Sequence, residues 1–245
     1  MLKTKNGIMI AVPNESIRNI LTFTTCRFGG FSEGVYSNLN MGFGVNENIE
    51  TVRRNHKKVA ETFGIKELAR VNQVHGSRIH KIEKSDGYIE NADGLFTEKS
   101  NLALAIMTAD CFSVQLIGNK AVANLHCGWR SIYSNIMSNA FQMFEKIQDK
   151  INTAVVGIGI CEKCYEVSEE LAVKFSDKFG INILKDDNGN FFLDLRKIIV
   201  QNLLKSDIKN ILHINYCSKC DSFLYSHRRD KGKTGRMMSV LMKYD

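Results

Sequence analysis

The stretch Leu102-Ala103-Leu104-Ala105-Ile106-Met107-Thr108-Ala109-Asp110-Cys111 decides how the fold of this chain is interpreted. Its first six residues form a continuous apolar run, which is typical of a strand buried on both faces. Two similar runs follow, Ala121–Leu125 and Thr153–Ile158. Side chains at the ends of buried strands are rigidly aimed, and Cys111 comes at the C-terminal end of the first run.

Amphipathic patterns lie around and between these runs and predict helices. The apolar stripes are Ile49–Phe63, Ile132–Ile147, Leu171–Phe179 and Leu195–Leu203. Their expected end signals are the glycines Gly64 and Gly180 and the capping side chains Ser168 and Asp194. Strand-like and helix-like segments therefore alternate, and the stripes are expected to be core-facing.

The composition is that of an ordinary globular protein, with 44% hydrophobic and 24% charged residues in 245. We expect a single domain over residues 1–245, because no Pro/Ser-rich linker divides the chain. The first residues carry no apolar stretch of signal-peptide length, and no segment approaches the roughly 20 apolar residues of a membrane span. We therefore expect a cytoplasmic protein with no membrane partner. The sequence carries no signal for the oligomeric state.

The net charge of +7 suggests a nucleic-acid partner, but the lysines are dispersed, as on an ordinary solvated surface. We therefore expect no nucleic-acid partner. The exception is His227–Arg236, which has five Lys/Arg in ten residues around two glycines. Arginine forks bind phosphate oxygens bidentately, and glycines let backbone N–H groups approach an anion. This segment favours a small phosphate, although its spacing fits no Walker-type loop.

Three short segments each offer one metal ligand: His75 in Gln73–Gly76, Cys111, and His126 in Asn124–Trp129. Two imidazoles and a thiolate are a common zinc ligand set, and a catalytic zinc keeps a fourth position open for water or substrate. The same set also occurs at trigonal copper centres. Spacing alone does not establish that the three residues converge.

The remaining clustered thiols form two C-x-x-C pairs, Cys161–Cys164 and Cys217–Cys220. Their separation far exceeds the roughly 15–20 residues of a zinc ribbon. The spacing favours ordinary thiols over a second, structural zinc, although distant knuckles can meet in space. The odd number of seven cysteines also argues against a disulfide framework. His56, His80 and His213 lack any partner signature and are expected to be ordinary surface or core residues.

Longer motifs follow one another along nearly the whole chain. They are Thr24–Ser32, Asn38–Asn40, Gln73–Gly76, Ala92–Thr97, Thr108–Cys111, His126–Arg130, Cys164–Val167 and Ser226–Asp230. In this order they resemble the YfiH/YlmD family, the "laccase-domain" polyphenol oxidoreductases that are also known as purine nucleoside phosphorylases. Ser113, Ser131 and Gly157–Cys164 depart from the family pattern in loops around the ligands, and these departures bear on substrate preference rather than on the ligands.

The resemblance implies an α/β/β/α sandwich of mixed β-sheets, with Zn²⁺ held by the catalytic trio His75, Cys111 and His126. It also implies phosphorolysis of adenosine, inosine, guanosine and methylthioadenosine, with adenosine deaminase activity beside it. The expected partners are therefore purine nucleosides and phosphate. Zinc suits both reactions, since it lowers the pKa of bound water to about 7 and can help to hold a phosphate.

Arginines are the expected anion-binding residues, with Arg228 and Arg229 as first choices and Arg27 and Arg130 as second choices. Two carboxylates, Asp110 and Glu166, are expected either as acid–base groups or as partners of the ligand imidazoles. A plain surface or capping role fits either carboxylate equally well.

Three alternatives stay open at this point. A copper-dependent polyphenol oxidoreductase would load Cu²⁺ at the His-His-Cys set, but an oxidase with several coppers needs more ligating histidine pairs than six histidines supply. A metal-independent hydrolase would use Cys111 as nucleophile and His126 as base. A purely structural or binding role is the non-enzymatic alternative.

Overall fold

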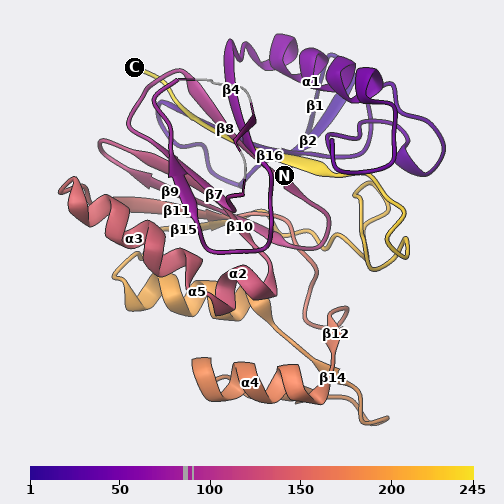
Figure 1. The fold of residues 1–245 in the computed structure, drawn as a ribbon, viewed down its shortest axis with the longest axis vertical. Helices are drawn as coiled ribbons and strands as arrows, with labels where there is room; N and C mark the ends of the chain where they lie inside the picture. The colour runs from indigo at the N-terminus through magenta and orange to yellow at the C-terminus, as the bar shows by residue number, and fades with distance from the viewer. Residues whose placement is uncertain (85–87, 90) are drawn as a thin grey trace.

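Two mixed β-sheets lie face to face between helices in the computed structural model, which describes residues 1–84, 88–89 and 91–245 (Figure 1). The larger sheet has the strand order β1 (Leu2–Lys5), β2 (Ile8–Ala11), β3 (Ile20–Thr25), β16 (Met237–Lys243), β8 (Leu102–Thr108), β4 (Glu67–Val71) and β6 (Tyr88–Ile89). The smaller sheet has the order β15 (Ile211–His213), β11 (Ile151–Val156), β9 (Phe112–Gly118), β10 (Val122–Cys127), β7 (Gly94–Thr97) and β5 (Ile79–Lys81). A minor sheet pairs β12 (Glu166–Val167), β14 (Phe191–Phe192) and β13 (Leu184–Lys185).

Helices cover the outer faces of both main sheets (Figure 1). On the larger sheet lies α1 (Ile49–Phe63), preceded by a 3₁₀ turn at Gly34–Tyr36. On the smaller sheet lie α2 (Trp129–Tyr133), α3 (Ile136–Lys146) and α5 (Leu195–Lys205), with α4 (Glu169–Phe179) packed further out. Among the described residues, no helix combines the length and apolar character needed to span a membrane.

Strand β8 shows why the opening stretch is apolar throughout. Leu104 and Ile106 point into the core between the two sheets, whereas Ala103 and Ala105 belong to the core under α1. Both faces of the strand are therefore covered, which removes the alternation of apolar and polar residues seen in half-exposed strands. The α/β/β/α sandwich of mixed sheets is confirmed.

Most predicted helix ends are confirmed. Gly64 and Gly180 end α1 and α4 with left-handed φ values of 69° and 63°. Ser168 and Asp194 accept backbone N–H bonds at the starts of α4 and α5. The single helix predicted over Ile132–Ile147 is wrong, because Asn135 adopts a left-handed φ of 63° and divides it into α2 and α3.

Two connections cross from the larger sheet to the smaller one at the same end of the sandwich. The β4–β5 connection carries His75, and the β8–β9 connection carries Cys111. Because β4 and β8 are parallel neighbours, their C-terminal ends lie side by side. Strand β10 runs antiparallel to β9, and its last residues, His126 and Cys127, pair with the first residues of β9. The topology thus delivers three distant residues to one edge.

Candidate metal centre and substrate cavity

His75, Cys111 and His126 converge at this edge. One ligand atom from each lies within 4.8 Å of the others. His126 is buried, Cys111 is half-buried and His75 is exposed, so the group opens toward solvent on the His75 side. Such a trio with one accessible side matches the three-ligand, open-position arrangement of catalytic zinc sites.

Asp93, just before β7, holds two of the ligands in place. One carboxylate oxygen accepts from His126 Nδ1 at 2.8 Å and from the His75 backbone N–H at 2.9 Å. The other accepts the backbone N–H groups of Val74 and Gly76 at 3.2 and 2.6 Å. The bond to Nδ1 leaves His126 Nε2 as the atom that faces the centre. Asp93 therefore has the orienting role that the sequence offered to Asp110 or Glu166.

The backbone around the centre is constrained. His75 has a left-handed φ of 60° and Asp110 a φ of 94°, conformations that non-glycine residues rarely adopt. An added Cβ at Gly128 would lie 2.8 Å from Cys111 Sγ and 3.3 Å from His75 Cδ2. Only glycine at this position leaves the ligands room to approach each other.

The ligands also set one another's protonation. Burial raises the pKa of Cys111, but the charge of His126 and hydrogen bonds from His126 and His75 outweigh it and lower the pKa to about 6. Burial lowers the pKa of His126, but Cys111 and Asp93 outweigh it and raise the pKa to about 9. A thiolate ready for a soft or borderline cation is the state that the metal-free group favours at neutral pH. The donor set fits zinc.

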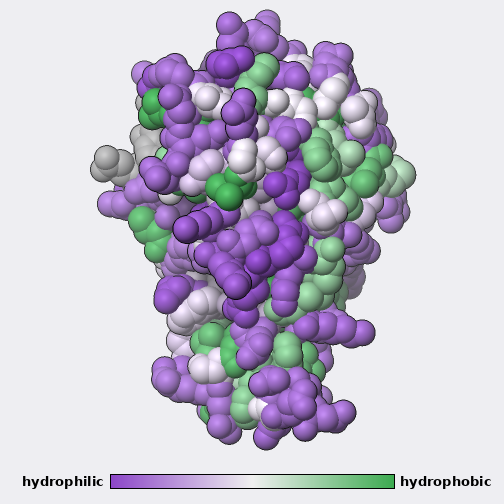
Figure 2. Space-filling model, turned by 90° about the vertical axis from the view of Figure 1, so that its right-hand side faces the viewer, coloured by the Kyte–Doolittle hydropathy of each residue, from purple (hydrophilic) through white to green (hydrophobic). Residues whose placement is uncertain are grey.

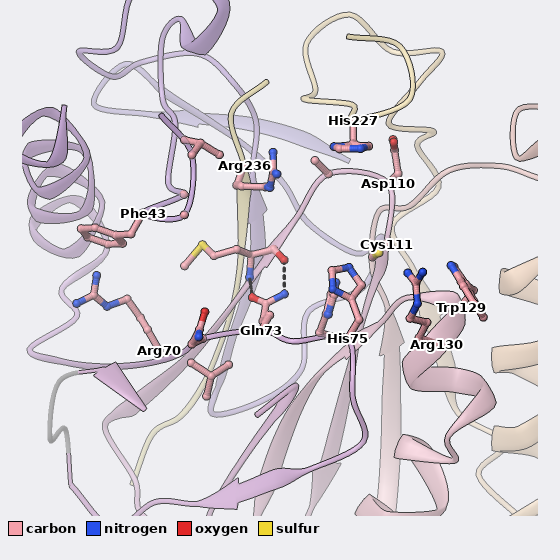
Figure 3. Close-up of a pocket in the computed structure, with 18 of the residues that line it drawn as sticks. Phe43, Arg70, Gln73, His75, Asp110, Cys111, Trp129, Arg130, His227 and Arg236 are labelled. Atoms are coloured by element: carbon pink, nitrogen blue, oxygen red, sulfur yellow. Dashed lines mark hydrogen bonds between the residues drawn. The ribbon is translucent and has the colours of Figure 1, made fainter. Parts of the chain in front are cut away.

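The trio lies in the wall of a cavity of about 590 Å³, a volume typical of small-molecule sites. Phe43 and Arg70 lie at one end of it, Trp129 and Arg130 at the other, and His75 between them (Figure 3). The side-chain amide of Gln73 holds part of the cavity wall in place, because it accepts the Met107 N–H and donates to the Met107 C=O, both at 2.8 Å. Figure 2 looks at the right-hand side of Figure 1, where strongly hydrophilic side chains gather in the middle of the face.

Positive charge dominates the cavity wall. Its lining includes Arg70, Arg130, Arg228 and Arg236, and Asp110 is its one carboxylate among the described residues. Asp110 is itself engaged, because it accepts the hydroxyls of Ser218 and Ser226 at 2.6 and 2.7 Å and the Arg228 backbone N–H at 2.6 Å. The cavity is therefore suited to an anionic ligand next to the metal centre.

The arginines expected at the site divide into two groups. Arg130 and Arg228 line the cavity, each with its guanidinium over an aromatic ring, that of Trp129 at 4.2 Å and that of Tyr165 at 5.3 Å. Arg27 lies outside the cavity lining. Its guanidinium donates a hydrogen bond to the Ser37 carbonyl at 3.0 Å and stacks on the ring of Tyr225.

Arg229 points away from the cavity although it directly follows Arg228. Its guanidinium donates to backbone carbonyls between Ser218 and Leu224 at 2.7–3.3 Å and to the Asp230 carboxylate at 2.8 Å. Arg229 therefore stabilises the surrounding loops and does not face a ligand. Glu166 is exposed. Its contribution to the site is its backbone carbonyl, which accepts a hydrogen bond from the Arg228 guanidinium at 2.8 Å.

Sequence reasoning missed Arg70 and Asp93, and it included Arg236 only as the last residue of the basic segment His227–Arg236. Asp93 lies inside one of the motifs singled out above, so the motif itself was the available signal. Arg70 and Arg236 are the penultimate residue of β4 and the residue just before β16. No local pattern marks Arg70, and the basic segment does not single out Arg236 from its other cations, because the position of each at the cavity follows from strand order.

Comparisons with known proteins agree with this architecture. The chain is 29% identical over 240 residues to purine nucleoside phosphorylase YlmD of Geobacillus stearothermophilus, covering 89% of this chain and 88% of the relative. It is 31% identical over 241 residues to a purine nucleoside phosphorylase of Haemophilus influenzae, covering 94% and 97%.

Solved structures are similar over the whole length. The crystal structure of YlmD from Geobacillus stearothermophilus superposes with a TM-score of 0.89 at 25% identity, covering 99% of this chain and 98% of that one. That of the Bacillus licheniformis protein YfiH gives 0.87 at 28% identity, with the same coverage of 99% and 98%. A family model matches residues 21–243, and the chain thus belongs to the family described as multi-copper polyphenol oxidoreductase laccase.

Proposed function

We propose that this protein is a zinc-dependent purine nucleoside phosphorylase. The observation that carries the proposal is the position of the His75–Cys111–His126 group in the wall of a cavity that is lined by four arginines. Phosphorolysis needs an anion held beside the nucleoside, whereas oxidation of a neutral phenol does not. The names of the relatives in Geobacillus and Haemophilus support the same reaction class.

His75, Cys111 and His126 would hold the zinc, and Asp93 would keep the two loops and the His126 ring in position. Bound zinc supplies a Lewis acid to an oxygen of phosphate or water at its open position. The thiolate of Cys111 would lower the net charge of a bound zinc below that of an all-histidine site, so the zinc would compete less strongly with the arginines for the phosphate.

Arg228 and Arg130 are the proposed phosphate-binding residues. Arg228 uses one Nη1 donor on the Glu166 carbonyl, and its backbone is fixed by Asp110, so the side chain is preorganised with further donors left for an anion. The ring of Tyr165 lies under its guanidinium. Preorganisation of this kind lowers the entropy lost when the phosphate is bound.

We further propose adenosine, inosine, guanosine and methylthioadenosine as substrates, with adenosine deamination as a second activity at the same centre. Deamination uses water rather than phosphate and does not require the anion-binding residues. We place the protein in the cytoplasm, because all seven of its cysteines are free thiols.

Copper-dependent phenol oxidation is the competing reaction, and the family description favours it. Transfer of electrons to oxygen by several coppers needs several histidine-rich ligand groups. All six histidines lie in the described part of the chain, and four of them, His56, His80, His213 and His227, join no group of metal ligands there. The ligand inventory therefore supports a single hydrolytic or phosphorolytic centre.

The test is a nucleoside panel run with and without phosphate on zinc-loaded and copper-loaded protein. We expect the zinc form to release adenine and ribose 1-phosphate from adenosine and to leave phenolic dyes unoxidised. Phenol oxidation by the copper form, together with a zinc form inactive on nucleosides, would overturn the proposal.

Arg228→Gln separates the two nucleoside reactions. Loss of a charge-assisted contact worth about 1.5–3 kcal/mol should raise the KM for phosphate at least about tenfold and leave deamination nearly unchanged. Lys233→Gln is the matched control, because it removes a charge from the same segment at an exposed position outside the cavity lining. Equal losses in both reactions for Arg228→Gln would assign this arginine a structural role.

A further inference from the structure

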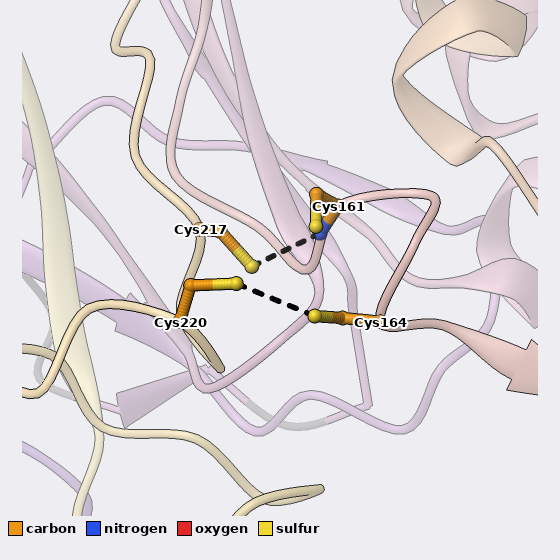
Figure 4. A group of neighbouring side chains, drawn as sticks. All are labelled: Cys161, Cys164, Cys217 and Cys220. Carbon is orange, nitrogen blue, oxygen red and sulfur yellow. Dashed lines mark hydrogen bonds between the residues drawn. The ribbon is translucent and has the colours of Figure 1, made fainter.

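The two C-x-x-C pairs, which spacing alone favoured as ordinary thiols, meet in space. The sulfur atoms of Cys161, Cys164, Cys217 and Cys220 lie within 4.8 Å of one another. Figure 4 shows them pointing toward a common centre from two separate loops, with Cys164 Sγ and Cys220 Sγ 3.4 Å apart. None of the four belongs to the cavity lining described above.

The spacing suits a metal rather than disulfides. A regular tetrahedron with Zn–S bonds of about 2.3 Å has sulfur atoms about 3.8 Å apart. The four sulfurs all lie within 4.8 Å of one another and Cys164 Sγ lies 3.4 Å from Cys220 Sγ, so the cluster is compact enough for this spacing. A disulfide needs a sulfur–sulfur bond of about 2.05 Å between two partners, and it would not require a second pair at the same place.

The backbone presents the thiols for binding. The N–H of Cys161 donates to Cys217 Sγ at 3.3 Å, a bond that favours a thiolate at Cys217. A parallel β-bridge joins Gly159 to Cys217 and places the two turns side by side. Asp221 fixes the second turn by accepting the Cys217 N–H at 2.8 Å. The loops are thus held together by contacts that do not involve the metal.

Charge around the cluster also fits a dianionic centre. Four thiolates and one divalent cation carry a net charge of −2. Each turn contains a lysine between its cysteines, Lys163 and Lys219, and the Arg196 guanidinium is close enough to feel the charges of Cys161 and Cys217. These three cations offset part of the charge that the centre would carry, alongside the acidic Glu162 and Asp221 in the same turns.

We propose that Cys161, Cys164, Cys217 and Cys220 bind one structural zinc ion as four thiolates. This site is distinct from the His75–Cys111–His126 centre. Binding forms four Zn–S bonds and releases to solvent the protons of those cysteines that are still thiols. Soft thiolate ligands in a closed set select zinc over the hard cations, and a closed set leaves no position for substrate.

The zinc would brace one wall of the substrate cavity. Tyr165, which carries the Arg228 guanidinium, directly follows Cys164. Ser218, between Cys217 and Cys220, donates its hydroxyl to Asp110 at 2.6 Å, and the adjoining residue of Asp110 is Cys111. In each of the two cysteine loops, a residue next to a cysteine thus contacts a residue that lines the cavity: Tyr165 contacts Arg228, and Ser218 contacts Asp110.

The direct test is the metal content of gently purified, reduced protein, measured by elemental analysis. Wild-type protein should contain two zinc ions per chain. Cys164→Ser and Cys220→Ser should each contain one, and the buried control Cys26→Ala, which alters a thiol outside both clusters, should contain two. A zinc content that is the same in Cys164→Ser and Cys220→Ser as in wild type, or iron bound in place of the zinc that these variants lose, would overturn the proposal.

Cobalt substitution keeps the test independent of how well each variant folds and of the proposed catalytic function. Wild-type protein loaded with Co²⁺ should show the intense charge-transfer and visible bands of a tetrahedral tetrathiolate. Cys111→Ser should keep these bands, because it alters only the other centre. Absence of the bands from wild type, or a Cys164–Cys220 disulfide in protein kept under reducing conditions, would refute the site.

Discussion

Replacing Asp93 by Asn should weaken zinc binding although the side chains of His75, Cys111 and His126 are unchanged. The carboxylate accepts four hydrogen bonds, from His126 Nδ1 and from the backbone N–H groups of residues 74–76. The amide keeps one accepting oxygen and turns an NH₂ group toward two donors, so two charge-assisted bonds worth about 1.5–3 kcal/mol each are lost. We expect zinc affinity to fall by about 10–100-fold, the usual effect of removing such an orienting partner.

The measurement is competition with a chromophoric chelator at fixed pH, with urea unfolding of the metal-free protein beside it. Asp149→Asn is the matched control. Asp149 is also buried and accepts three backbone N–H bonds, from residues 119–121, but it lies away from the centre. Both variants should lose stability, and only Asp93→Asn should lose zinc. Unchanged zinc affinity in Asp93→Asn would refute the orienting role.

Three further predictions follow from the same contacts. Zinc affinity, measured by chelator competition, should rise about tenfold per pH unit between pH of about 6 and 9. In this range zinc displaces the proton of His126, whose pKa is about 9, but none from Cys111, whose pKa is about 6. A zinc affinity that does not change with pH would contradict the thiolate–imidazolium pair. Arg229→Ala should lower the free energy of unfolding by about 2–4 kcal/mol in urea titrations, since several backbone carbonyls lose a charged donor, and a neutral result would show that those carbonyls are satisfied by water. Gly128→Ala should lose metal in elemental analysis, because its Cβ would lie 2.8 Å from the Cys111 sulfur. The control Gly44→Ala, whose Cβ would have nothing within 4 Å, should retain the metal. Equal metal content in the two variants would mean that the loop at Gly128 shifts to accommodate the methyl group.

Local patterns predicted the secondary structure well where packing and capping agree. The apolar run at 102–107 became β8, and the capped stripes became α1, α4 and α5. Asn135 broke the remaining stripe because helical periodicity continues through a residue whose backbone leaves the helix. An amphipathic pattern records which side of a segment is buried and is insensitive to one turn residue between two short helices.

Ligand chemistry and the family resemblance singled out His75, Cys111 and His126, which the structure brings together, but they did not predict the surroundings of this group. Arg229 and Arg228 are adjacent in sequence and chemically identical, yet one faces the cavity and the other a set of backbone carbonyls. The meeting of the two C-x-x-C pairs depends on the bridge between Gly159 and Cys217, a contact between segments far apart in the chain. Such facts are set by strand order and loop path, which no local window contains.

The proposed ligands lie where the two sheets are connected, since His75 and Cys111 are in the connections that cross from the larger sheet to the smaller one, and His126 is in the smaller sheet. A metal ion bound there would therefore connect the two sheets at this edge of the sandwich. Movement of one sheet relative to the other would then distort the geometry of the ligands. Leu104 and Val155 pack in the core between the two sheets and are not part of the cavity lining, so a packing defect there would test whether metal retention depends on the contact between the sheets. Retention of the proposed metal would then report how well the two sheets pack against each other.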